Sequence, residues 1–282
     1  MIQLENIRFG YVKDRPLFQE LSLTMEPGHI YGLLGKNGAG KTTLLKIMSG
    51  LCFPDSGTAA ILGENAALRK AEVLQNLYFL QEEMFVPHLK TGQFVKAYAP
   101  FYPNFSQSQF EEYLRELELD RENGYMDKLS HGQKKKVLIA FALATNTKIL
   151  FMDEPTNGLD IPSKSSFRKL MASAADDSRL VLISTHQVRD LHSLIDMVAI
   201  LDNGRMLLNA PSYEITRKLL FDVDDMKSSE GTVFYTEETP RGSYQVKANV
   251  NGIDSNLDLE LLFNAAISNK NEISNLFKSS AL

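Results

Sequence analysis

Apolar residues along this chain fall into short blocks separated by segments of helical periodicity. Short blocks rich in β-branched and large apolar residues, bounded by turn residues, are typical of strands. The predicted strands are Ile2–Phe9, Leu21–Met25, Ile30–Leu34, Thr58–Ile61, Leu77–Leu80, Ile149–Met152, Leu180–Ser184, Met197–Leu201 and Arg205–Leu208. Because helical patterns interleave with these strands, the pattern predicts an α/β fold.

Two segments depart from this alternation. From about residue 85 to 136 the pattern is helical, and in Gln109–Leu119 apolar residues recur at steps of three and four. This segment also carries an aromatic-rich stretch, which belongs either to the core or to a partner-binding surface. Its members are Phe94, Tyr98, Phe101, Tyr102 and Phe105.

The composition changes after Pro211. The segment TVFYTEETPRGSYQVKA predicts a hairpin around Pro240, Arg241 and Gly242, and Ser255–Ile267 predicts a capped helix. A piece of this length is too short for an independent enzyme domain. We therefore expect a main domain over residues 1–210 and an accessory extension over 211–282, which could pack on the core, aid dimerisation or cover a sheet edge.

A glycine-rich loop joins one predicted strand to an amphipathic helix. The stretch GKNGAGKTTLLKIMSG fits G-x-x-x-x-G-K-S/T with Gly35, Gly40, Lys41 and Thr42. Glycines allow positive φ and let backbone N–H groups surround phosphate oxygens, and the following helix directs its positive dipole end at the same anion. Lys41 adds a charge for the outer phosphates, and Thr42 offers a hydroxyl to Mg²⁺. The loop predicts a nucleoside triphosphate site rather than a plain glycine turn.

Two further strands end in polar residues. In KILFMDEP the apolar residues are followed by Asp153, which could hold Mg²⁺ through water, and by Glu154, which could act as general base or orient the attacking water. RLVLISTH ends at His186. The pattern alone is compatible with an ordinary histidine at a strand end.

A second anion site is predicted at Ser130–Gln133, where Ser and Gly open an apolar helix with free N–H groups. Two phosphate sites in one chain suggest a two-fold dimer in which each copy completes the site of the other. The basic run Lys134–Lys136 is expected to form one solvated helix turn.

Composition limits the class of protein, the partners and the compartment that fit this chain. The chain has 282 residues, of which 44% are hydrophobic and 23% charged, so it can bury a full core. A net charge of -5 gives no global reason to bind nucleic acid or an anionic membrane. The lone Cys52 fits a reducing compartment. The N-terminus begins a strand rather than a signal peptide, and the apolar run Val137–Ala144 is far shorter than the ~20 residues of a membrane span. We expect a soluble protein whose membrane role would require a partner.

Taken in order, these motifs resemble the ATP-binding-cassette (ABC) ATPases over roughly Met1–Ala210. The matching segments are Tyr11 (the adenine-stacking aromatic), Gly35–Thr43 (Walker A), Gln81 (the Q-loop), Leu129–Gln133 (the LSGGQ signature), Ile149–Glu154 (Walker B with the catalytic glutamate), Asn157–Asp160 (the D-loop) and His186 (the switch histidine). His131 replaces the first signature glycine, and Ile161 stands before Pro162 where the family often has proline. Because the phosphate contacts are expected from Ser130 and Gly132, activity should survive.

The resemblance implies a P-loop NTPase core with an antiparallel β subdomain and an inserted helical subdomain near 85–136. It implies ATP and Mg²⁺ as cofactors and Glu154, His186 and Lys41 as catalytic residues. The implied metal ligands are Thr42, Gln81 and Asp153. The implied nucleotide contacts are Tyr11, Gly35, Lys36, Asn37, Gly38, Ala39, Gly40, Lys41, Thr42, Thr43, Gln81, Ser130, Gly132, Gln133 and Asp160.

The implied function is the ATPase subunit of an ABC transporter. As a homodimer or heterodimer it would drive separate integral-membrane permease subunits from the cytoplasmic face, without nucleic acid. The helical subdomain, with Gln81, would face the permease, and the spacing around Tyr98–Phe105 favours an exporter-like type. One alternative is a soluble ABC ATPase acting on nucleic acid or ribosomes, against which the single cassette and lone cysteine weigh. Another is a regulatory ATP-binding module without turnover, against which Glu154 and His186 weigh.

Overall fold

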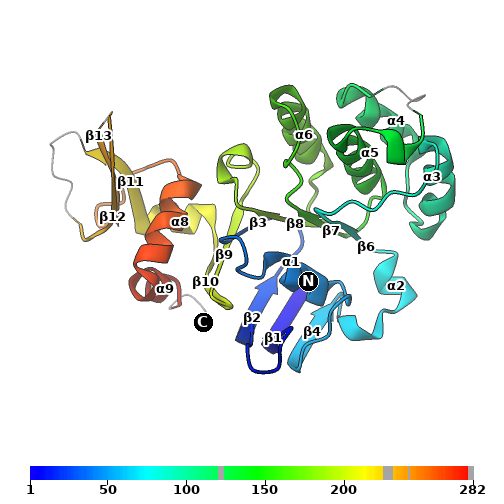
Figure 1. Ribbon diagram of the computed structural model, residues 1–282. Coiled ribbons are helices and arrows are strands. Elements are labelled where there is room, and N and C mark those ends of the chain that lie inside the picture. The colour runs from blue at the N-terminus through cyan, green and yellow to red at the C-terminus, as the bar shows by residue number, and fades with distance from the viewer. Residues whose placement is uncertain (120–123, 225–230, 241, 279–282) are drawn as a thin grey trace.

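The computed structural model describes residues 1–119, 124–224, 231–240 and 242–278, which form three sheets with helices packed around them (Figure 1). The central sheet has the strand order β10-β9-β3-β8-β7-β6. Its strands are β3 (Ile30–Leu34), β6 (Leu77–Leu80), β7 (Ile149–Asp153), β8 (Leu180–Thr185), β9 (Met197–Asp202) and β10 (Arg205–Pro211). All neighbours pair in parallel except β10, which runs antiparallel to β9. The carboxyl ends of the parallel strands meet at one edge, where ligands bind in such sheets.

A four-stranded antiparallel sheet forms a second layer, with the order β2-β1-β4-β5. Its strands are β1 (Ile2–Phe9), β2 (Phe18–Met25), β4 (Ser56–Ile61) and β5 (Glu64–Asn65). Helix α1 (Lys41–Met48) lies between the two sheets, and its Leu44, Leu45 and Met48 join a cluster that draws on both. The expected antiparallel subdomain is confirmed. Two short helical segments, η1 (Ala66–Leu68) and α2 (Ala71–Leu74), lead to β6.

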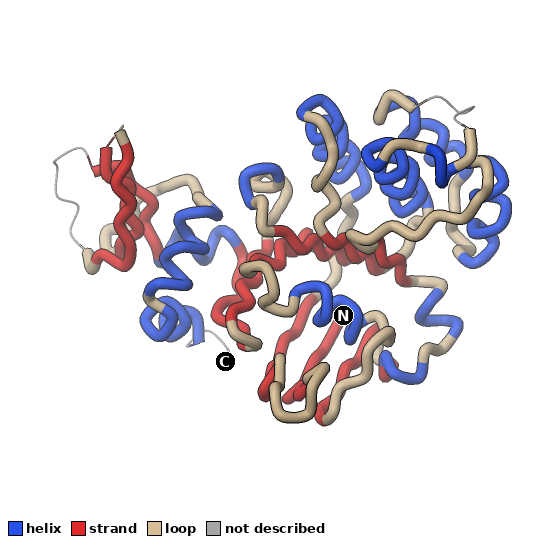
Figure 2. The backbone as a smooth tube through the Cα atoms, in the orientation of Figure 1, coloured by secondary structure: helices blue, strands red, loops and turns tan. Residues whose placement is uncertain are grey.

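A group of helices lies on the opposite face of the central sheet (Figure 2). They are α3 (Thr91–Tyr98), η2 (Ala99–Phe101), α4 (Gln107–Glu116), η3 (Met126–Lys128), α5 (His131–Ala144) and α6 (Ile161–Ala174). The aromatic-rich stretch divides between core and surface. Phe94 is buried, Tyr102 and Phe105 pack on the ring of Phe141, and Tyr98 and Phe101 stay exposed.

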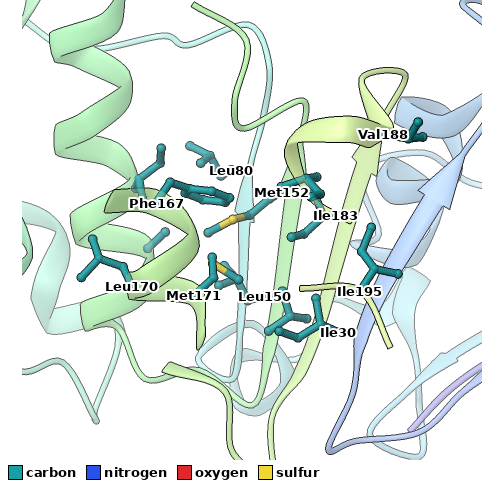
Figure 3. Close-up of a cluster of buried hydrophobic side chains, with 14 of the residues drawn as sticks. Ile30, Leu80, Leu150, Met152, Phe167, Leu170, Met171, Ile183, Val188 and Ile195 are labelled. Carbon is teal, nitrogen blue, oxygen red and sulfur yellow. The ribbon is translucent and has the colours of Figure 1, made fainter. Parts of the chain in front are cut away.

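Each central strand contributes to two apolar clusters, because successive side chains point to opposite faces of a sheet. Leu150 and Met152 of β7 meet Phe167 and Met171 of α6 on the helical face (Figure 3). Phe151, between them in sequence, belongs to the cluster around α1. This double burial explains why these strands appear as continuous apolar runs rather than as alternating patterns.

The extension after Pro211 is folded onto the main domain. It contains α7 (Ser212–Lys218), β11 (Leu219–Asp224), β12 (Val233–Thr239), β13 (Gly242–Ala248), α8 (Leu259–Ser268) and α9 (Lys270–Lys278). The predicted hairpin is confirmed as the antiparallel pair β12–β13, although Arg241 of its turn lies outside the described residues. The predicted capped helix is α8, whose Asp258 accepts hydrogen bonds from the N–H groups of Glu260 and Leu261.

The extension and the main domain share one hydrophobic core. Leu262 and Ala265 of α8 belong to the same cluster as Ile200 and Leu208 of the central sheet. Helix α9 contacts the edge strand β10, and Lys270 Nζ lies 2.5 Å from Asp202 Oδ2. The extension therefore packs on the core and covers a sheet edge, while its part in dimerisation stays a prediction. Within the described ranges, no helix has both the length and the apolar character to cross a membrane.

Candidate functional site

The glycine-rich loop follows β3 and opens α1, as the sequence predicts. Gly38 and Gly40 adopt φ of 79° and 104°, and a Cβ on Gly40 would lie 2.8 Å from the ring of Phe18. Lys41 Nζ turns back along the loop, donating to the carbonyls of Gly35 at 2.7 Å and Lys36 at 3.4 Å. Burial lowers the pKa of the Lys41 ammonium from its ordinary value, and nearby carboxylates, first that of Glu154, oppose this shift.

The end of β7 brings two carboxylates to this loop. Thr42 Oγ1 donates to Asp153 Oδ2 at 2.6 Å, and Ser184 Oγ donates to the other carboxylate oxygen. Asp153 is almost fully buried. The hydroxyl and the carboxylate are hard oxygen ligands of the kind that Mg²⁺ binds together with phosphate oxygens and water. The donor set at Thr42 and Asp153 therefore fits this metal.

Glu154 lies where β7 and β8 end side by side. Its Oε2 accepts a hydrogen bond from Thr185 Oγ1 at 3.2 Å. Its Oε1 accepts one from the backbone N–H of His186 at 3.0 Å and lies 2.7 Å from His186 Nδ1 and 3.8 Å from Lys41 Nζ. The structure thus brings together the three predicted catalytic residues from three separate segments. The strand pattern alone did not distinguish His186 from an ordinary histidine at a strand end. The neighbouring ends of β7 and β8 bring it into contact with Glu154.

A cavity of about 490 Å³ opens over these groups. It is lined by Tyr11, Leu17, Lys36, Asn37, Gly38, Gly40, Lys41, Thr42, Thr43, Glu82, Asp153, Glu154 and His186. Gln81 is exposed just after β6, and the next residue, Glu82, lines the cavity and accepts from Asn157 Nδ2 at 3.0 Å. Sequence reasoning missed Glu82, whose only signal is its place beside Gln81. The metal role of Gln81 stays a prediction.

Tyr11 stands at the rim of the cavity. Its hydroxyl lies 3.0 Å from Thr43 Oγ1, and its ring meets Phe9 edge-on with centroids 5.0 Å apart. The residue is 67% exposed. This aromatic face at the rim of the cavity is available for base stacking, and the contact with adenine stays a prediction.

The predicted second anion site forms a separate surface on the same chain. Ser130 caps α5: its Oγ accepts from the N–H of Gln133 at 3.2 Å, and Gln133 Oε1 accepts from the N–H of Ser130 at 3.0 Å. Asp160 caps α6, where its Oδ1 accepts from the N–H of Ser163 at 2.8 Å, and hydrogen bonds from Ser163 lower the pKa of its carboxyl. The described residues lining the cavity include none of Ser130, Gly132, Gln133 and Asp160.

The basic run after the signature is not one solvated turn, which corrects that expectation. Lys135 is 0% exposed and its Nζ donates to the backbone carbonyl of Glu154 at 2.9 Å, whereas Lys134 and Lys136 are half-buried. The physical reason is that α5 is enclosed by other elements: every residue from Val137 to Ala144 is buried. Burial lowers the pKa of Lys135, and the surrounding carboxylates, first that of Glu82, oppose this.

Comparisons with known proteins identify the family of this chain. The profile of a family described as ABC transporter matches residues 18–157. Methionine import ATP-binding protein MetN 1 of Oceanobacillus iheyensis is 33% identical over 237 residues, which cover 76% of this chain and 68% of that protein. Nod factor export ATP-binding protein I of Burkholderia lata is 30% identical over 222 residues, covering 77% and 72%. A solved ATP-binding subunit of an ABC transporter has a TM-score of 0.70 at 25% identity, covering 77% and 92%.

A strand–loop–helix phosphate site beside a carboxylate strand defines a P-loop NTPase. Within that class the chain belongs to the ABC transporter family. It is an ATP-binding and ATP-hydrolysing subunit of an ABC transporter.

Proposed function

We propose that the cavity over the glycine-rich loop binds ATP with Mg²⁺ and that hydrolysis takes place between Lys41 and Glu154. The observation that carries this is the convergence of a buried ammonium, the Thr42–Asp153 pair and the Glu154–His186 pair in one cavity. The metal would be held by Thr42 and Asp153, with Gln81 as the further ligand that the family resemblance suggests. Bound there, the metal would supply positive charge that offsets the charge of the phosphates.

The chain's own groups divide the chemistry between them. Lys41 neutralises charge that develops on the transferred phosphoryl group. Glu154 accepts a proton from, or orients, the water that attacks the γ-phosphorus, and the bond to the β-phosphate oxygen breaks to give ADP and phosphate. His186 holds the Glu154 carboxylate through both its backbone N–H and its ring and would stabilise the γ-phosphate. These contacts support the assigned roles, because positioned groups need little reorganisation in the transition state.

We infer that two copies form the working unit. Ser130, Gly132 and Gln133 lie at a helix start on the surface, outside the cavity of their own chain. A two-fold dimer would place each of these starts on the outer phosphates of the partner's ATP, with Asp160 linking the two sites. Whether the partner is an identical chain or a relative is decided by that interface.

We propose that the dimer drives separate membrane permease subunits from the cytoplasmic face, with residues 1–210 as catalytic domain and 211–282 as accessory extension. The exposed rings of Tyr98 and Phe101 on the helical subdomain support a contact of this kind. The relatives compared above include one import and one export protein, so the family alone does not define the direction of transport. The aromatic stretch around Tyr98 is the reason to favour export.

Glu154→Gln tests this mechanism, because it preserves size and hydrogen bonding but removes the base. Hydrolysis should stall after the dimer closes, so size exclusion with light scattering should show a monomer without nucleotide and a dimer with ATP. Adding Ser130→Arg, which crowds the second phosphate site, should restore the monomer. Hydrolysis by Glu154→Gln at the parent rate would contradict the catalytic role. A monomer at saturating ATP, with permease present, would contradict the shared site.

A further inference from the structure

Lys135 is the one fully buried lysine of the described chain, and its ammonium has a specific target. Its Nζ donates to the backbone carbonyl of Glu154 at 2.9 Å across the boundary between α5 and the end of β7. A buried ammonium is unfavourable unless it is well paired. Here the partner belongs to the residue whose carboxylate the proposed mechanism uses.

The backbone of Glu154 needs support. Its φ is 47°, in the left-handed region that residues with a Cβ seldom adopt. Such a conformation persists only where its surroundings hold it. Here the Glu154 N–H donates to the carbonyl of Ser184 at 3.0 Å, while its carbonyl accepts from the N–H of Asn157 at 3.2 Å and from Lys135.

This backbone conformation sets where the carboxylate points. The Glu154 side chain leaves the strand end toward Thr185 and His186 and lies 3.8 Å from Lys41 Nζ. A displacement of the Glu154 main chain would move these oxygens away from the water that attacks the phosphate. Of the groups that hold this backbone, Lys135 contributes the charged donor, and hydrogen bonds from charged groups are stronger than those from neutral ones.

We propose that Lys135 is a positioning residue for ATP hydrolysis, holding the main chain of Glu154 so that its carboxylate faces His186 and the attacking water. This inference rests on the proposed role of Glu154. Because Lys135 belongs to the helix that begins at Ser130, it also ties the signature surface for the partner's ATP to the catalytic carboxylate of its own chain.

Lys135→Met tests the proposal, because methionine keeps an unbranched apolar stem of similar length and removes the donor. We expect kcat for ATP hydrolysis to fall by about 10- to 100-fold, as for a small displacement of a catalytic group. KM for ATP should change by less than about twofold, because the residue does not act on substrate binding. The matched control is Lys134→Met on the same helix turn, which should keep the parent kcat and Tm.

A second comparison separates positioning from general structural damage. In the Glu154→Gln background, adding Lys135→Met should leave the residual rate and the ATP-dependent dimer unchanged, since the carboxylate that Lys135 positions is already gone. Loss of ATP affinity or of the dimer in this background, or a parent kcat in Lys135→Met alone, would overturn the inference. If Glu154→Gln itself hydrolyses at the parent rate, the proposed function fails instead.

Should Lys135→Met not fold, Lys135→Gln keeps a polar N–H donor on a stem one atom shorter. We expect a folded protein with reduced kcat and parent KM. A Lys135→Gln protein with raised KM and parent kcat would equally overturn the positioning role.

Discussion

At the scale of single residues, the site consists of donors and carboxylates placed by two neighbouring strand ends. The register of β7 and β8 pairs Asp153 with Ser184, so that Ser184, Thr185 and His186 each meet a carboxylate oxygen of Asp153 or Glu154. Preorganised donors of this kind account for much of the catalytic power of enzymes.

Lys41 carries the sharpest residue-scale prediction. Lys41→Ala removes the charged donor for the outer phosphates, and hydrogen bonds from charged groups contribute about 1.5–3 kcal/mol. We expect ATP affinity, measured by calorimetry, to fall by roughly tenfold or more. Lys46→Ala, on the same helix but away from the cavity, is the matched control. Unchanged affinity in a folded Lys41→Ala protein would rule out this phosphate site.

Two substitutions at Tyr11 separate the contribution of its ring to nucleotide binding from that of its hydroxyl. Tyr11→Ala should weaken nucleotide binding by about 1–3 kcal/mol, the range for stacking of a base on an aromatic ring. Because stacking depends little on base identity, ATP and GTP should lose similar affinity. Tyr11→Phe, which keeps the ring and loses only the contact with Thr43, should stay close to the parent. Equal affinities for Tyr11→Ala and the parent, measured by calorimetry, would leave Tyr11 as a surface residue packed on Phe9.

At the scale of elements, the two ends of α5 have different roles: one anchors the helix in the core, and the other presents its start at the surface. Its C-terminal part, from Val137 to Ala144, is buried on all sides, while its start at Ser130 is exposed and closed by a capping box with Gln133. The buried part anchors the helix, and the exposed start is thereby held rigidly at the surface. A rigid helix start is suited to binding an anion that a second copy delivers.

Ser130→Asp distinguishes these roles. Aspartate is as good an N-cap as serine, so Tm should change little, whereas Ser130→Ala should lose about 0.5–2 kcal/mol of unfolding free energy. The added negative charge would repel the partner's phosphates, so Ser130→Asp in the Glu154→Gln background should not dimerise with ATP in light scattering. A normal ATP-dependent dimer in this protein would place the partner's nucleotide elsewhere.

At the scale of the whole molecule, the extension is part of the folded body. It closes the β10 edge of the central sheet and shares its core. Arg189 Nε, three residues after His186, lies 2.5 Å from Glu260 Oε2 of α8. Truncation at Pro211 would therefore expose the apolar faces of β9 and β10. A point substitution in α8 is the better test of how the extension contributes.

Leu262→Ala provides that test. Leu262 is fully buried in the shared core, so its truncation should lower the free energy of unfolding by about 2–5 kcal/mol. Because Leu262 does not line the nucleotide cavity, ATP affinity should remain near that of the parent. Urea unfolding followed by circular dichroism should show one transition at lower urea. Two separate transitions would show instead that the extension unfolds by itself.

The sequence by itself determined the strands of the first 211 residues, the glycine loop, the carboxylate pair and the hairpin. These follow from short-range causes: side-chain period, turn residues and the positive φ that glycine allows. The two-residue strand β5 was not predicted, because so short a segment shows no alternation of apolar and polar residues. The order of the motifs predicted the role of His186, because the pattern of its own strand did not distinguish it from an ordinary histidine at a strand end.

Only the tertiary structure decided which residues from distant segments meet. Lys135 stands in a run of three lysines that indicates a solvated turn, yet the packing of α5 against β7 places the Glu154 carbonyl 2.9 Å from its Nζ. Glu82 enters the cavity and its neighbour Gln81 does not line it, because the chain turns after β6. The position of Phe141 likewise decided which residues of the aromatic stretch are packed inside, namely Phe94, Tyr102 and Phe105. Such outcomes depend on which surfaces are covered by elements far away in sequence. The local sequence pattern does not contain this information.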